Sequence, residues 1–133
     1  MEFRQTLSIY EQIARMLEDN VIAGAYGEGD RLPSVRALAA DVQVNPNTVQ
    51  RTFQTLQSDG VVAKERGVGY FVADGAREQI LRRRRKIYTS EVLPEQFRQL
   101  ALLGFGVDEV AAAYADYLRR EAAAPSTHPS PRG

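Results

Sequence analysis

The feature that most constrains the fold is a pair of short helical patterns separated by only three residues. Ser34 is placed to cap the first pattern, whose apolar residues recur at helical spacing over 34–42. Asn45 and Pro46 start the second, because asparagine accepts hydrogen bonds from free amides and proline fits the first helical position; this pattern runs over 46–59. Two helices joined by so tight a turn predict a helix-turn-helix.

A glycine-containing hairpin pattern follows these helices directly. Residues 61–65 and 70–72 are strand-like, and the turn at 66–69 between them holds two glycines. A third helix, opened by a capping-box sequence, is expected over 8–23, ahead of the pair. A hairpin in this position is a wing, so the fold class that we expect is mainly α with a small β-hairpin: a winged helix-turn-helix domain over 1–75.

The rest of the chain divides into an all-helical arm over 76–122 and a tail over 123–133 that we expect to be disordered from its composition. The arm is interrupted at Pro94, and the sequence leaves open whether the helix there is continuous or broken. An arm this small cannot bury its apolar stripes by itself, so we expect it to dimerise with a second copy of the chain. The predicted dimerisation residues are Ile80, Leu81, Ile87, Tyr88, Phe97, Leu100, Val110, Tyr114, Tyr117 and Leu118.

Composition argues against several classes of function. The chain has no cysteine, and its single histidine, His128, lies in the tail, so we expect no metal site, no cofactor and no enzymatic activity. No apolar run approaches the roughly 20 residues that span a bilayer, and no signal sequence opens the chain. We therefore expect a cytoplasmic protein with no membrane partner.

The charges are distributed in a way that suits DNA, although the formal net charge is zero. Five of the seven basic residues before position 75 fall in the loop before the second helix, in the helix pair or in the wing. On the helix over 46–59, Val49, Phe53 and Leu56 share a face that we expect to be core, and the opposite face is polar. Amide and guanidinium groups at the start of such a helix read bases in the major groove.

The predicted DNA-binding residues come from the loop and start of the second helix, the recognition helix and the wing. They are Arg31, Ser34, Arg36, Asn45, Asn47, Thr48, Gln50, Arg51, Lys64, Arg66, Gly67 and Gly69. Competing interpretations are a merely solvated polar face, arginines paired with Asp30 or Asp41, and an ordinary hairpin turn. The basic run 82–86 is either solvated, or steers DNA, or pairs with acidic residues of a second subunit.

Residues 8–73 closely resemble the DNA-binding domain of GntR-family transcription regulators. The resemblance is carried by Tyr10-x-Gln12-Ile13, Gly29-Asp30-Arg31-Leu32-Pro33-Ser34-Val35-Arg36-x-Leu38-Ala39, Val44-Asn45-Pro46-Asn47-Thr48-Val49-x-Arg51, Leu56-x-x-x-Gly60 and Arg66-Gly67-x-Gly69-x-Phe71-Val72. It implies operator contacts by Arg36, Asn45, Asn47, Thr48, Arg51, Arg66 and Gly67. Some members carry arginine or threonine where Pro46 stands, so their base preference does not carry over.

The length and placement of the arm resemble the YtrA-type subfamily, whose members dimerise through two C-terminal helices and often repress transporter operons. We therefore expect a repressor that binds double-stranded DNA as a homodimer, and a two-fold dimer implies a pseudo-palindromic operator. The sequence does not identify an effector ligand. Two other functions remain open from the sequence: a winged-helix module that binds protein, and a small-molecule-binding protein.

Overall fold

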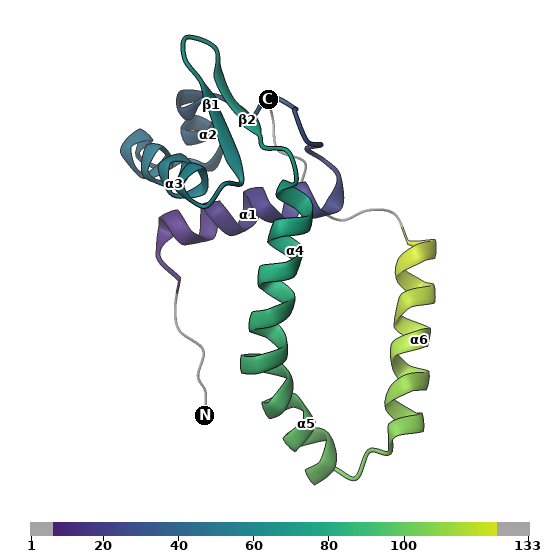
Figure 1. Ribbon diagram of the computed structural model, residues 1–133. Helices are drawn as coiled ribbons and strands as arrows, with labels where there is room; N and C mark the ends of the chain where they lie inside the picture. The colour runs from purple at the N-terminus through teal and green to yellow at the C-terminus, as the bar shows by residue number, and fades with distance from the viewer. Residues whose placement is uncertain (1–6, 125–133) are drawn as a thin grey trace. The chain divides into compact units, whose positions relative to one another are not determined.

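The computed structural model describes residues 7–124 of the chain, so His128 and most of the predicted tail lie outside it (Figure 1). Its elements are α1 (Ile9–Ala23), α2 (Val35–Val42), α3 (Pro46–Ser58), β1 (Val62–Glu65), β2 (Gly69–Val72), α4 (Ala76–Ile87), the π-helical turn η1 (Tyr88–Val92), α5 (Leu93–Leu102) and α6 (Val107–Ala123). The predicted fold class, mainly helical with one small hairpin, is confirmed. The chain divides into two compact units, and the boundary along the chain lies between Arg82 and Arg83.

Local capping chemistry sets where the helices of the first unit begin. The Ser8 hydroxyl accepts a hydrogen bond from the Glu11 amide at 3.3 Å, and the Glu11 carboxylate accepts from the Ser8 amide at 2.9 Å, which is the predicted capping box of α1. Asn45 caps α3, since its side-chain oxygen accepts from the Asn47 amide at 2.7 Å, and Pro46 opens the helix. The predicted starts of these helices are therefore confirmed.

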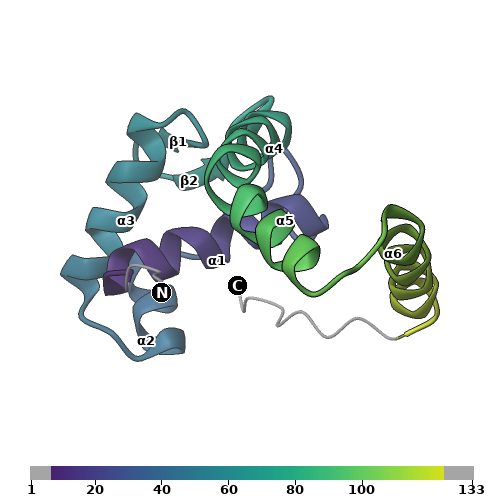
Figure 2. The same cartoon turned by 90° about the horizontal axis from the view of Figure 1, so that it is seen from below.

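The core of the first unit forms where α3 crosses α1 and packs beside α2 and the wing (Figures 1 and 2). Val49, Phe53 and Leu56 of α3 are buried there, as their shared face predicts. The buried apolar residues are Ile13, Leu17, Val21, Leu32, Leu38, Ala39, Val49, Phe53, Leu56, Val61, Val62, Tyr70, Val72, Ala76 and Ile80. Burial of this face turns the polar face of α3 outward.

The wing is an antiparallel pair in which Val62 lies opposite Val72 and Glu65 opposite Gly69. The segment before α2 extends this pair, because the Leu32 amide donates to the Tyr70 carbonyl at 2.8 Å and the Val72 amide donates to the Asp30 carbonyl at 2.9 Å. These bonds fix the base of the hairpin to the helix-turn-helix, and its tip extends beyond α2 and α3 (Figure 1).

The first unit extends beyond the predicted boundary at residue 75 and includes the start of α4. Ala76 and Ile80 are fully buried in its core. The Arg77 guanidinium donates to the Ile22 carbonyl at 3.0 Å, and the Gln79 amide donates to the Asp59 carbonyl. Ile80, predicted as a dimerisation residue, is thus a core residue of the winged unit and is not available to a partner.

The second unit begins within α4 and passes through Pro94 without a break in the helical path. The Leu93 amide donates to the Tyr88 carbonyl, a wider turn than the α-helical one, and α5 follows directly. Proline lacks an amide hydrogen and its ring collides with the carbonyl four residues earlier, that of Ser90, so a wider turn ahead of it relieves the clash. The question that the sequence left open at Pro94 is answered by a π-helical turn.

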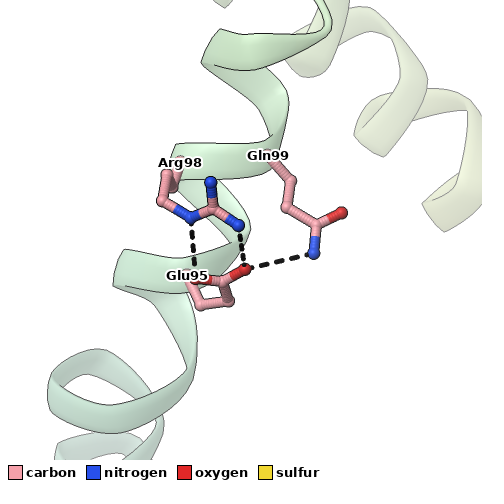
Figure 3. Close-up of polar contacts among 3 residues, drawn as sticks. All are labelled: Glu95, Arg98 and Gln99. Carbon is pink, nitrogen blue, oxygen red and sulfur yellow. Dashed lines mark hydrogen bonds and ion pairs between the residues drawn. The ribbon is translucent and has the colours of Figure 1, made fainter. Parts of the chain in front are cut away.

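No residue from 83 to 124, the described part of the second unit, is buried. Phe97, Tyr114 and Tyr117 are each more than half exposed. In α5 the Glu95 carboxylate accepts from Arg98 at 3.0 and 2.9 Å and from Gln99 at 3.2 Å (Figure 3). Within residues 7–124 no helix is long and apolar enough to cross a membrane.

Candidate nucleic-acid interface

The outward face of α3 presents polar side chains at the surface of the first unit. Asn47, Arg51 and Gln54 are exposed, and Thr48 and Gln50 are partly exposed. The Asn45 side chain accepts a hydrogen bond from the Asn47 amide, and the Asn45 carbonyl accepts one from the Thr48 amide. Asn45 therefore caps the N-terminus of α3. A helix N-terminus carries partial positive charge and is suited to a phosphate.

Arg51 lies on an aromatic ring from a different helix. Its guanidinium carbon is 4.0 Å from the centre of the Tyr10 ring, which belongs to the first turn of α1. The buried Thr52 hydroxyl donates to the carbonyl oxygens of Tyr10 and Thr48 at 3.2 and 3.0 Å, so α3 is also bonded to the backbone of this turn. A cation over an aromatic face at this distance is attracted by the ring quadrupole.

Gln50 connects α3 with the wing. Its amide donates to the Tyr70 hydroxyl at 3.1 Å, and the Tyr70 ring packs on Phe53 with 4.6 Å between ring centres. Lys64 of β1 lies over the same ring, with its ammonium nitrogen 5.7 Å from the ring centre. Tyr70 therefore links the recognition helix, the core and the wing.

Arg31 supports the wing from below its tip. Its guanidinium donates to the Val68 carbonyl at 2.6 Å, while Asp30, one suggested ion-pair partner, accepts from the Gly27 amide at 2.7 Å. Gly69 lies against Arg31 at a φ of +146°, and a β-carbon there would be 3.2 Å from the Arg31 Nε. Arg31 thus holds the turn of the wing in place, a role that the sequence did not predict.

Arg36 and Arg66 are exposed, and neither side chain makes a hydrogen bond or ion pair with the residues of 7–124. Arg36 lies in the first turn of α2, which is capped by the Ser34 hydroxyl accepting from the Ala37 amide at 3.0 Å. Arg66 lies at the wing tip beside Gly67, whose φ of +78° is a conformation that favours glycine.

Two residues of this surface were not among the predicted site residues. Tyr10 lies in the helix that is expected over 8–23, and Tyr70 in the strand-like segment 70–72. Each contacts a recognition-helix side chain far along the chain, and sequence spacing gives no signal for such a pair. Only the tertiary structure shows the contacts of Tyr10 with Arg51 and of Tyr70 with Gln50.

One depression on the first unit is small for a ligand pocket. A shallow depression of about 240 Å³ lies along α1, smaller than the roughly 300–1,000 Å³ typical of ligand pockets. Its lining residues are Leu7, Tyr10, Glu11, Ala14, Arg15, Glu18 and Thr55. Across residues 7–124, no three acidic or histidine side chains are grouped so as to hold a metal ion.

Comparison with known proteins identifies the family. The family of bacterial regulatory proteins called gntR matches residues 9–72. The HTH-type transcriptional regulator YhcF of Bacillus subtilis is 36% identical over 82% of this chain and 88% of its own length. The chain belongs to the GntR family. It is accordingly a DNA-binding transcriptional regulator and not an enzyme.

Two further comparisons cover most of the chain. The HTH-type transcriptional repressor YtrA of B. subtilis is 31% identical over 74% of this GntR-family chain and 72% of its own length, which supports the YtrA-type subfamily. A crystal structure assigned to the GntR family from Bacteroides thetaiotaomicron is 38% identical, covers 86% of this chain and 99% of its own, and superposes with a TM-score of 0.67. The winged-helix fold is thus shared.

Proposed function

We propose that this GntR-family regulator is a repressor that binds a pseudo-palindromic operator as a homodimer. The observation that carries the proposal is the polar face of α3, exposed beside a wing whose tip holds Arg66. Asn47 and Thr48 are at the end of α3 that enters a major groove, where amide and hydroxyl groups contact base edges. Arg36 and Arg66 are the expected phosphate contacts, with Lys64 behind them.

The second unit supplies the argument for a dimer. None of its described residues is buried, although Phe97, Leu102, Tyr114 and Tyr117 are large and apolar. Exposed apolar surface of this kind marks an interaction site, and a second copy of the same arm satisfies it symmetrically. The proposed contact residues are those of the predicted set that the core does not bury: Leu81, Ile87, Tyr88, Phe97, Leu100, Val110, Tyr114, Tyr117 and Leu118.

A two-fold dimer presents two copies of α3 to one face of the duplex. The half-sites are then inverted repeats whose centres lie about one helical turn, or a multiple of it, apart. Two joined modules also bind more tightly than one because the second event is intramolecular. Repression follows when the occupied operator overlaps a promoter, which agrees with the word repressor in the name of the YtrA relative.

Selection of bound fragments from random duplex DNA, followed by sequencing, tests this function. We expect one consensus made of two inverted half-sites. When this sequence is placed in a promoter, we expect the protein to block transcription from that promoter. Asn47→Ala should weaken discrimination at a base pair in each half-site, by about 1–3 kcal/mol. Gln54→Ala, on the same exposed face but farther from the helix start, is the matched control.

Three results would overturn parts of the proposal. Recovery of no enriched sequence would remove sequence-specific DNA binding. A single half-site consensus, bound by a monomer, would remove the dimer. Enhanced transcription from the bound promoter would replace repression by activation.

A further inference from the structure

We propose that Tyr10, in the first turn of α1, is a specificity-determining residue that holds Arg51 in position to read a guanine. The inference rests on the proposed function and adds to it a residue outside the helix-turn-helix and wing. Tyr10 is half-buried and Arg51 is exposed, so the pair lies at the edge of the surface that α3 presents. Tyr10 acts through Arg51 and is a positioning residue.

The geometry of the pair leaves the hydrogen-bonding edge of the arginine free. The Tyr10 ring, 4.0 Å from the guanidinium carbon, interacts with the flat face of that group. The N–H donors of a guanidinium point outward in its plane, and those of Arg51 donate to no residue in 7–124. A guanidinium fixed by its face and open at its edge is suited to the bidentate contact with O6 and N7 of guanine.

Gln50 and Arg51 therefore have different tasks, although both follow Val49 on the recognition helix. Gln50 uses an amide hydrogen on the Tyr70 hydroxyl and so connects α3 with the wing. Arg51 is held without using a donor. Of these two side chains, the arrangement assigns base reading to Arg51.

The first turn of α1 is itself held in place. Thr52 donates to the Tyr10 carbonyl, which fixes the backbone of this turn against α3. The Glu11 carboxylate accepts from the amide and the hydroxyl of Ser8 at 2.9 and 3.0 Å, and these bonds, more than the nearby charge of Arg51, lower the pKa of Glu11. Because Glu11 is bound in the cap, it forms no ion pair with Arg51 that would compete with DNA.

Removal of the ring should release Arg51 and weaken operator binding. Immobilising a flexible side chain on binding costs about 0.5–1.5 kcal/mol, which corresponds to about a 2- to 12-fold loss of affinity for each recognition helix. Selectivity for one base pair in each half-site should relax as well. The salt dependence of binding should stay the same, since Tyr10 contacts no phosphate in this proposal.

The experiment compares Tyr10→Leu, Tyr10→Phe and the full-length wild-type protein on the selected operator and on variants with single base-pair changes. We expect Tyr10→Leu to lose affinity and selectivity and Tyr10→Phe, which keeps a ring, to behave as wild type. Tyr26→Leu, the same change elsewhere in the unit, should leave selectivity intact. If Tyr10→Leu lowers the melting temperature of the protein, Tyr10→Met is used in its place.

A double-mutant cycle with Arg51→Ala separates a role through Arg51 from any other. Tyr10→Leu should have no further effect once Arg51 is alanine, and additive losses would overturn the proposal. Unchanged selectivity in Tyr10→Leu would also overturn the proposal. So would a loss of affinity and selectivity in Tyr10→Phe equal to that in Tyr10→Leu, or a salt dependence of Tyr10→Leu whose slope is reduced by about 1 per site. Failure of wild-type protein to bind any operator would instead refute the proposed function.

Discussion

Ile80→Ala tests whether the start of α4 belongs to the winged unit or to the arm. Ile80 is 0% exposed and lies in the same core as Phe53 and Leu56, whereas Ile87, seven residues on in the same helix, is 46% exposed. Truncation of a fully buried isoleucine removes its transfer free energy and leaves a cavity, for a total of about 2–5 kcal/mol. We therefore expect Ile80→Ala to lower the free energy of unfolding by that amount.

The magnitude is large enough to measure by urea denaturation. With a slope of about 1–2 kcal/mol per molar urea, even a loss of 2 kcal/mol moves the midpoint by roughly 1–2 M. The loss should not depend on protein concentration, because the contacts of Ile80 lie within one chain. Ile87→Ala is the matched control, for which we expect a small change in unfolding and a weaker dimer. If Ile80→Ala left unfolding unchanged and weakened only dimerisation, the assignment of Ile80 to the core would be refuted.

Three further predictions concern the wing, α5 and the arm. Arg31→Met should free the wing tip at a cost of about 1 kcal/mol and speed amide exchange near Val68; unchanged exchange with a reduced salt slope would indicate a phosphate contact instead. Hydrogen bonds from Arg98 and then Gln99 lower the pKa of Glu95 to about 2, so its stabilising contribution is complete above the usual pKa of 4.5 and is lost as pH falls through about 2. A carbon-detected NMR titration of Glu95 with a midpoint near 4.5 would contradict this. Tyr117→Glu should dissociate the dimer in sedimentation experiments, and an unchanged mass would argue against the arm as the interface.

The parts of the fold that were predictable from the sequence depend on local chemistry. The cap at Ser8 and the start of α3 at Asn45 and Pro46 each use side chains within three residues of the amides that they serve. The buried face of α3 follows from helical periodicity alone. The exposed polar face of α3 could be placed for the same reason, since a buried face on one side of a helix requires an exposed face on the other.

The parts that were not predictable depend on contacts between distant residues. Ile80 and Ile87 have the same spacing whether a partner or the protein's own core covers them, so the pattern did not separate the two. The hydrogen bond from Arg31 to the wing could not be predicted, because nothing nearby in the sequence reveals the Val68 carbonyl. The wider turn ahead of Pro94 likewise needed backbone geometry, since proline in sequence is compatible with a break, a kink or a continued helix.

Equilibrium binding to the selected operator as a function of salt tests most directly whether the exposed face of α3 and its flanking arginines engage DNA. Arg36 and Arg66 from two subunits give four phosphate contacts, so log K should fall against log salt with a slope of about −4 or steeper. Arg66→Ala, present in both subunits, should reduce the steepness by about 2. Affinity that stays flat over the roughly 50–200 mM range would contradict the account.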